Sequence, residues 1–81
     1  VDDPGQHRPT LWPGATGKWV QVLQTSLNVK RAESGLAPIS IDGDFGKGTL
    51  SSLIDFQRRQ GLVDDGICGA KSWAALGPWV S

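Results

Sequence analysis

The fold is decided by the stretch Ile41-Asp42-Gly43-Asp44-Phe45-Gly46-Lys47-Gly48-Thr49, which returns more loosely as Asp65-Gly66-Ile67-Cys68-Gly69-Ala70-Lys71-Ser72. Both copies read Asp-Gly, two residues, Gly, two residues, and then a small hydroxyl residue. The correspondence continues beyond them, with Leu50 aligned to Trp73 and Leu53 to Leu76. A phrase that recurs within 81 residues indicates one supersecondary unit that is used twice.

Each copy has the composition of a sharp turn that leads into a helix. Gly43 and Gly66 permit a positive φ, which a side chain would penalise. The aspartate before each of them can accept hydrogen bonds from the amides of its own turn. Gly46 and Gly69 then stand at the helix start, where small residues are favoured. Phe45 and Cys68 occupy matching positions, and we expect Ile41 and Ile67, which flank the turns, to anchor them in the core.

Working outward, the apolar spacing predicts three helices. Val20, Leu23 and Leu27 define one face of a helix from about Lys18 to about Lys30, started by Thr16 or Gly17. A second helix begins after Gly46 and ends at Gly61 in a C′ position. Its apolar face holds Leu50, Leu53, Ile54 and Phe56. A third helix covers about Ala70 to Leu76 and is stopped by Gly77-Pro78. The sequence therefore predicts an all-α fold, a small three-helix bundle with an internal pseudo-repeat.

Composition limits the domain count and the classes of partner. We expect residues 1–10, rich in Pro, Gly and charge, to be a linker or disordered tail, and residues 11–81 to be one domain. Eight basic and eight acidic side chains give no net charge, which argues against nucleic acid as a partner. No apolar run is long enough for a membrane helix. With no signal peptide and a first residue Val1, the chain is expected to be a mature or excised fragment of a larger protein. We also expect it to be a monomer.

The sequence contains few residues that could form a catalytic or metal-binding site. Cys68 is the only cysteine and is expected to be a small buried residue, while the only histidine, His7, lies in the leader. A calcium loop starting at Asp42 would place Lys47 at position 6 and Leu53 at position 12, where Gly and Glu are required. We therefore expect no enzyme activity, no metal and no cofactor.

The ordered set of residues resembles the peptidoglycan-binding domain found attached to cell-wall hydrolases. The set comprises Leu11, Gly14, Gly17, Val20, Leu23-Gln24, Leu27-Asn28, Ile41-Asp42-Gly43, Phe45-Gly46, Thr49, Leu53, Phe56-Gln57, Gln60-Gly61-Leu62, Asp65-Gly66-Ile67, Gly69, Ser72-Trp73 and Leu76. The resemblance implies a non-catalytic module that holds a linked hydrolase, such as an endolysin or amidase, against bacterial peptidoglycan. It also implies a secreted or cell-envelope location, or a phage lysin. Whether the glycan strand or the stem peptide is bound stays open.

The chain departs from the family pattern at five helical positions, one of which is Ser72, where threonine is commoner. Lys47 and Ala70 stand where the family often places proline, at the first position of a helix. Leu50 and Ile54 stand where similar domains usually carry polar residues. Two interpretations of this pair remain open: they widen the core contact, or they form an exposed apolar patch that meets a ligand or a partner domain.

Binding of the polymer would use exposed aromatic faces and polar groups near a groove. Among the tryptophans, Trp73 is expected to be buried, and Trp12 and Trp79 to cover the core. The candidate ligand-binding residues are Trp19, which can point outward from the first helix, Asp44 and Lys47, which the turn does not need, and Arg58 on the second helix.

An alternative function remains from another class. The same fold can act as a protein-interaction or propeptide-like module, or as a spacer, that positions or regulates a neighbouring catalytic domain. Propeptides of metalloproteases with a similar fold use a cysteine in a separate switch segment. Cys68 lies inside the second Asp-Gly phrase, which is the wrong place for that role.

Overall fold

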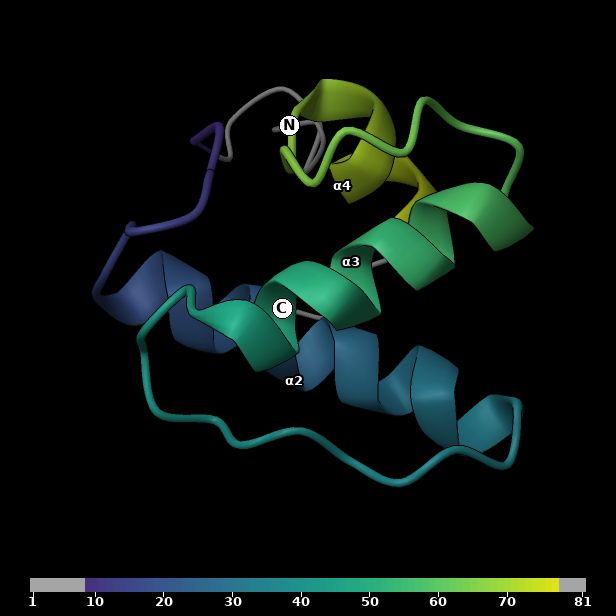
Figure 1. Cartoon of the computed structure of the whole chain (residues 1–81), viewed down its shortest axis with the longest axis horizontal. Helices are drawn as coiled ribbons and strands as arrows, with labels where there is room; N and C mark the ends of the chain where they lie inside the picture. The colour runs from purple at the N-terminus through teal and green to yellow at the C-terminus, as the bar shows by residue number, and fades with distance from the viewer. Residues whose placement is uncertain (1–8, 78–81) are drawn as a thin grey trace.

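A computed structural model describes residues 9–77, which form three α-helices joined by loops. The helices are α2 (Lys18–Glu33), α3 (Lys47–Arg59) and α4 (Ala70–Leu76). Figure 1 shows α3 in the middle of the molecule, with α2 below it and α4 above it in this view. Within the described range the only β-type pairings are two isolated bridges. The predicted all-α class and three-helix bundle are confirmed.

The helix ends follow the glycines. Helix α2 continues to Glu33, three residues beyond the expected Lys30, because the chain leaves the helix only at Gly35, where φ is +76°. The N–H of Gly35 bonds to the Ala32 carbonyl at 3.1 Å and that of Leu36 to the Arg31 carbonyl at 2.8 Å. Helix α3 ends in the same way, with Gly61 at φ +72°. This is the Schellman arrangement that favours glycine at C′.

The core lies between the three helices and the two Asp-Gly loops. Its fully buried side chains include Trp73 and Cys68, as the sequence predicts, and its members are Leu11, Val20, Leu23, Leu27, Phe45, Leu53, Phe56, Cys68, Trp73 and Leu76. Two expectations are wrong: Ile41 is 50% exposed and Ile67 is 40% exposed. The inward positions of the two turns belong instead to Phe45 and Cys68, which are 2% and 0% exposed.

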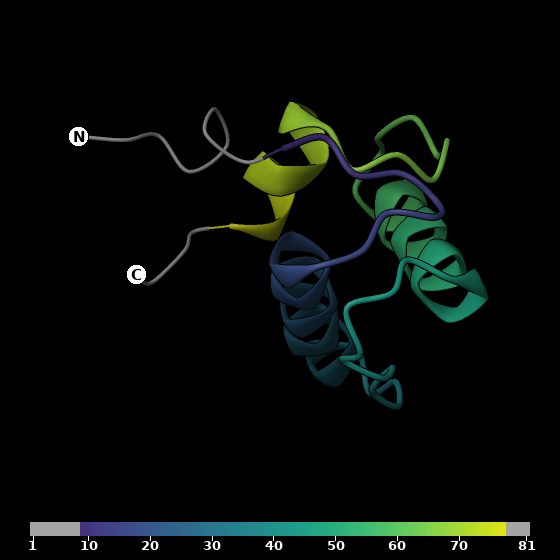
Figure 2. The same ribbon diagram turned by 90° about the vertical axis from the view of Figure 1, so that its left-hand side faces the viewer.

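The N-terminal segment joins the two loops. Leu11 exchanges a pair of backbone hydrogen bonds with Cys68, at 3.0 and 2.8 Å, and the Phe45 N–H donates to the Ala15 carbonyl at 2.9 Å. The indole Nε1 of Trp73 donates to the Pro9 carbonyl at 2.8 Å. In Figure 2 this segment passes from α4 to the start of α2. Trp12, expected to cover the core, is 56% exposed. Trp79 and His7 lie outside the described residues.

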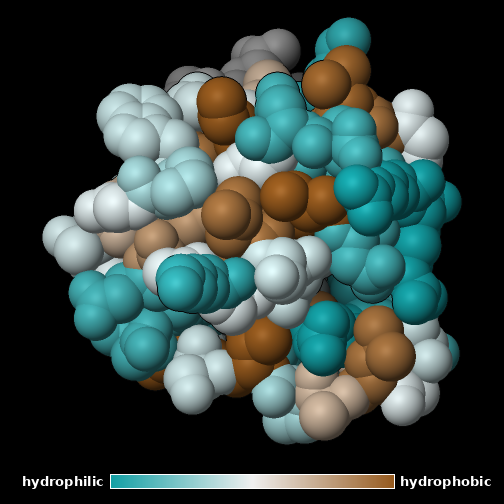
Figure 3. All heavy atoms as spheres, in the orientation of Figure 1, coloured by the Kyte–Doolittle hydropathy of each residue, from teal (hydrophilic) through white to brown (hydrophobic). Residues whose placement is uncertain are grey.

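Leu50 and Ile54 are both half-buried and pack over the second loop. A Cβ placed on Gly66 would lie 2.4 Å from Leu50 Cδ1 and 3.5 Å from Ile54 Cδ1, so this backbone needs a glycine beneath the two side chains. Leu50 also packs against the core. Figure 3 shows apolar atoms along the middle of this face, over α3. Among the described helices, none is both long and apolar enough to span a membrane.

Candidate ligand-binding site

A buried glutamine on α2 organises the first Asp-Gly loop. The Gln24 Nε2 lies 2.9 Å from Asp42 Oδ1, 3.0 Å from the Asp44 carbonyl and 3.0 Å from Thr49 Oγ1. The N–H of Gly43 donates to Gln24 Oε1 at 3.0 Å. One amide side chain therefore ties α2 to the turn and to the first residues of α3, and it satisfies polar groups that burial would otherwise leave unpaired.

A second buried glutamine, on α3, does the same for the second loop. The Gln57 Nε2 lies 3.3 Å from Asp65 Oδ1, 2.9 Å from the Ile67 carbonyl and 3.0 Å from Ser72 Oγ. The Gly66 N–H donates to Gln57 Oε1 at 3.0 Å. Every atom of the first network has its counterpart here. The repeated phrase of the sequence is thus accompanied by a repeated set of hydrogen bonds.

The aspartates of the phrase belong to these networks. Asp42 Oδ1 accepts from the Asp44 N–H at 3.0 Å, and Asp65 Oδ1 accepts from the Ile67 N–H at 2.9 Å, as the turn chemistry predicts. The bond from the Asp44 N–H and that from the Gln24 side chain hold the pKa of Asp42 below its ordinary value. These carboxylates are therefore occupied in holding the turns.

The candidates Asp44 and Lys47 line one surface groove beside the first loop. The groove has a volume of about 410 Å³ and is lined by Pro38, Ile39, Ser40, Asp42, Asp44, Gly46, Lys47, Gly48 and Thr49. Both side chains are exposed, and no ion pair of Lys47 is present within residues 9–77. The structure therefore brings these two predicted residues together, with a carboxylate and an ammonium available to a ligand.

A groove of about 390 Å³ lies beside the second loop at the equivalent place. Its lining includes Asp65, Ile67, Gly69, Ala70 and Ser72, which match Asp42, Asp44, Gly46, Lys47 and Thr49 of the first groove in order. The two grooves differ in chemistry, because apolar Ile67 and Ala70 replace Asp44 and Lys47, while Lys71 supplies a cation where the first groove has Gly48. The first groove is the one in which an exposed carboxylate and an exposed ammonium stand three residues apart.

Trp19 and Arg58 do not line the first-loop groove. Trp19 is 39% exposed and meets the Trp73 ring edge-on, with centroids 6.4 Å apart and an interplanar angle of 73°. Arg58 Nε donates to Asp64 Oδ2 at 2.6 Å, and this bond lowers the pKa of Asp64. The four candidates thus form one adjacent pair and two separate positions.

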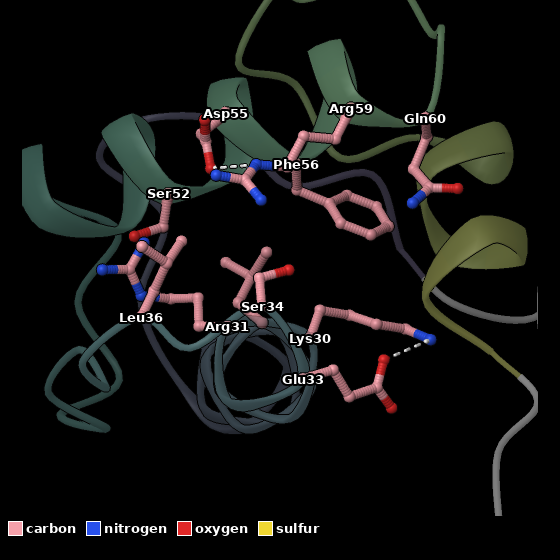
Figure 4. Close-up of a pocket in the computed structure, with 11 residues that line it drawn as sticks. Lys30, Arg31, Glu33, Ser34, Leu36, Ser52, Asp55, Phe56, Arg59 and Gln60 are labelled. Atoms are coloured by element: carbon pink, nitrogen blue, oxygen red, sulfur yellow. Dashed lines mark ion pairs between the residues drawn. The ribbon is translucent and has the colours of Figure 1, made fainter.

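A third hollow lies between the C-terminal halves of α2 and α3. This cleft of about 260 Å³ is lined by Leu27, Lys30, Arg31, Glu33, Ser34, Leu36, Ser52, Asp55, Phe56, Arg59 and Gln60. Figure 4 shows side chains from both helices directed into it, with the Phe56 ring between them. This cleft was not predicted, because it is made by residues of two helices whose apolar periodicity is analysed one helix at a time.

Charged side chains surround the cleft. The Arg59 Nε lies 2.9 Å from Asp55 Oδ2, and the Lys30 Nζ lies 3.8 Å from Glu33 Oε1 (Figure 4). The Arg31 Nε donates to the Ala37 carbonyl at 2.6 Å. Three cations and two carboxylates leave the lining with an excess of one positive charge.

Metal ligation is not evident within residues 9–77, where no group of three or more His, Cys, Asp or Glu side chains is close enough to hold an ion. Cys68 is buried in the core. The arrangement offers grooves, charges and hydrogen-bond donors, which is the chemistry of binding.

Comparison with known proteins gives a consistent match. Residues 16–76 match the peptidoglycan binding domain family. The chain is also 38% identical over 68 residues to an uncharacterized protein from the bpoA1 3′ region of Kitasatospora aureofaciens, and spans 55% of that protein's length.

Solved structures similar to this chain include a peptidoglycan-binding protein, the SleB N-terminal domain and a phage endolysin. A peptidoglycan-binding protein from Clostridioides difficile, crystallised with glutamine hydroxamate, is 31% identical with a TM-score of 0.77, and the match covers 86% of this chain and 41% of that one. The SleB N-terminal domain is 36% identical with a TM-score of 0.72, covering 85% and 89%. A Burkholderia AP3 phage endolysin is 36% identical with a TM-score of 0.73, covering 85% and 25%.

Proposed function

Because this chain belongs to the peptidoglycan-binding domain family, we propose that it anchors a covalently linked cell-wall hydrolase to bacterial peptidoglycan. The single observation that carries the proposal is the family match over residues 16–76. The similarity to part of a phage endolysin, of which this chain covers 25%, supports the attachment to a hydrolase. Such a module works in the cell envelope or outside the cell.

The mechanism is tethering without chemistry of its own. A shallow groove binds one unit of the polymer weakly, but the polymer presents many units. A linked enzyme is then held at high effective concentration beside its substrate bonds. This mechanism agrees with the hydrogen bonds that occupy Asp42 and Asp65 in their turns and with the burial of Cys68.

We assign part of the contact to the groove at the first loop. The Asp44 carboxylate and the Lys47 ammonium line it together and are exposed, so each can pair with an amide, hydroxyl or carboxylate of the polymer. Trp19 and Arg58 remain separate proposals, as an aromatic platform and a cation at other points on the surface. Sedimentation with peptidoglycan distinguishes wall binding from the alternative, a module that binds a neighbouring protein domain.

Sedimentation with purified insoluble peptidoglycan tests the proposal. The chain should pellet with the polymer, and a linked hydrolase should lose activity on intact walls, but not on soluble fragments, when the domain is deleted. The double variant D44N/K47Q should pellet less, while Gln21→Ala, an exposed change on α2, should pellet like the parent chain. A parent chain that stays in the supernatant would exclude wall binding and favour the protein-interaction function.

A further inference from the structure

We propose that the α2–α3 cleft is the site for the peptide part of peptidoglycan, a stem-peptide segment that carries a free carboxylate. This inference rests on the proposed function, because it names the portion of the same polymer that is bound. The cleft is separate from both Asp-Gly grooves: none of its lining residues lines either of them.

The first argument is the arrangement of the arginines. Arg31 Nε donates to the Ala37 carbonyl, and Arg59 Nε forms an ion pair with Asp55. No bond of their terminal Nη groups is present within residues 9–77. Two guanidinium groups with available Nη donors on one cleft are suited to a carboxylate, which guanidinium binds with paired hydrogen bonds.

The second argument is charge. Each carboxylate of the lining already has a cation beside it, Glu33 beside Lys30 and Asp55 beside Arg59. Arg31 is the cation left over, and its Nε partner is a neutral carbonyl. A ligand carboxylate would complete the balance of the cleft, whereas a neutral sugar would not.

The third argument is the apolar surface inside the cleft. Leu36, which is half-buried, and Phe56, which is 5% exposed, supply it, whereas Leu27 is fully buried. Sugar rings are bound through the face of an exposed aromatic side chain. The lining has no Trp or Tyr, and both described exposed tryptophans, Trp12 and Trp19, lie elsewhere. Short aliphatic side chains of a peptide suit this surface better than a sugar ring.

The size agrees with a short segment. A volume of about 260 Å³ lies just below the range of roughly 300–1,000 Å³ typical of sites for drug-sized ligands. The cleft therefore holds a few peptide atoms at the end of a stem and leaves the glycan outside.

The test is an NMR titration of the ¹⁵N-labelled 81-residue chain with three probes. These are a soluble stem peptide, the same peptide with its carboxylates amidated, and the glycan disaccharide without peptide. We expect amide shifts at Arg31, Ser52 and Arg59 with the free peptide only. Equal shifts with the amidated peptide or the disaccharide, or peptide shifts confined to the Asp-Gly grooves, would overturn the proposal.

Variants separate this site from general charge effects. Arg31→Gln should weaken stem-peptide binding by about tenfold, and Arg31→Lys should recover only part of the loss because lysine lacks the planar fork. Lys71→Gln on α4 removes the same charge outside the cleft and should bind as the parent does. Equal losses for R31Q and K71Q would reject the site.

Sedimentation with insoluble peptidoglycan distinguishes a failure of the cleft assignment from a failure of the wall-binding function. If the parent chain pellets with insoluble wall but the stem peptide causes no shifts in the cleft, only the cleft assignment fails. If the parent chain does not pellet, the wall-binding function itself fails.

Discussion

Two glutamines hold the loops of this domain, each at a position where apolar periodicity would place a core residue. Gln24 lies between Leu23 and Leu27 on the buried face of α2, and Gln57 follows Phe56 on α3. Both are 1% exposed. The sequence signalled them only as members of a family pattern. The physical signal for these glutamines was a polar residue on the core face of the helix that precedes each Asp-Gly turn.

Replacing Gln57 by leucine keeps the volume but removes every hydrogen bond to the second loop. The buried Gly66 N–H then loses its acceptor. We expect the free energy of unfolding to fall by about 2–4 kcal/mol, measured by urea denaturation. Gln60→Leu, at an exposed position on the same helix end, should change it by less than about 0.5 kcal/mol. Similar losses for the two variants would mean that the network stabilises little.

Asp42 predicts how the domain responds to acid. Its pKa is lowered in the folded state, so the stability it contributes is present above the unfolded-state pKa. That contribution is lost as pH falls through the folded-state pKa. Asp42→Asn keeps an oxygen acceptor but does not titrate. Thermal melts from about pH 6 to about pH 2 should therefore show a shallower loss for D42N than for the parent chain. An equally steep loss would contradict the role of this carboxylate.

At the scale of elements, α2 and α3 each lead through a glycine-ended Schellman turn to an Asp-Gly loop and on to the next helix. The third helix and the start of the second were predicted from the sequence with their observed bounds, because glycine fixes those positions. The end of α2 was placed three residues early. Arg31, Ala32 and Glu33 have good helix propensity, and α2 continues through them to the turn at Gly35.

The contact between α3 and the second loop gives a prediction at this scale. Gly66 and Gly61 both have φ of +72°, but a Cβ would meet Leu50 at 2.4 Å only at Gly66 and meets nothing within 4 Å at Gly61. Gly61→Ala should cost about 1 kcal/mol in unfolding free energy from backbone strain alone. Gly66→Ala should cost about 1–3 kcal/mol more because of overpacking.

The same pair of variants examines Leu50. Adding Leu50→Ala should recover part of the loss in G66A, as measured by urea denaturation, since it removes the atom that the new Cβ would contact. No recovery would indicate that the loop moves aside instead. A recovery would place Leu50 in the contact between helix and loop, which for this residue favours the first of the two interpretations drawn from the sequence.

At the scale of the whole molecule, the family match begins at residue 16 whereas the hydrogen-bonded structure begins earlier. Pro9, Leu11 and Ala15 bond to α4 and to both loops. A chain that starts at Thr16 loses these bonds and the buried Leu11 side chain. We expect its melting temperature, followed by circular dichroism, to fall by about 10 °C or more.

Two point variants serve as checks on that truncation. Leu11→Ala in the full chain should lose about 2–5 kcal/mol of unfolding free energy, whereas Trp12→Ala, at a side chain that is 56% exposed, should lose far less. A truncated chain that melts with the parent would show that residues before Thr16 do not support the fold.

The candidate site was less accessible to sequence reasoning than the fold. Asp44 and Lys47 are close in sequence and belong to one loop, so their proximity was predictable. The distance between Trp19 and that groove, and the cleft between α2 and α3, depend on how helices pack. That packing follows from side-chain shapes at several distant positions, which periodicity does not encode.

The paired glutamine networks have a consequence for how such domains diversify. In the two loops the inward atoms are held by the same bonds, while the outward positions differ, with Asp44 against Ile67 and Lys47 against Ala70. Surface chemistry is thereby uncoupled from folding. Exchanging these outward residues between the two loops would move the polar surface from the first loop to the second without changing the hydrogen bonds that hold either loop. Binding specificity can therefore evolve, or be engineered, by changing two side chains.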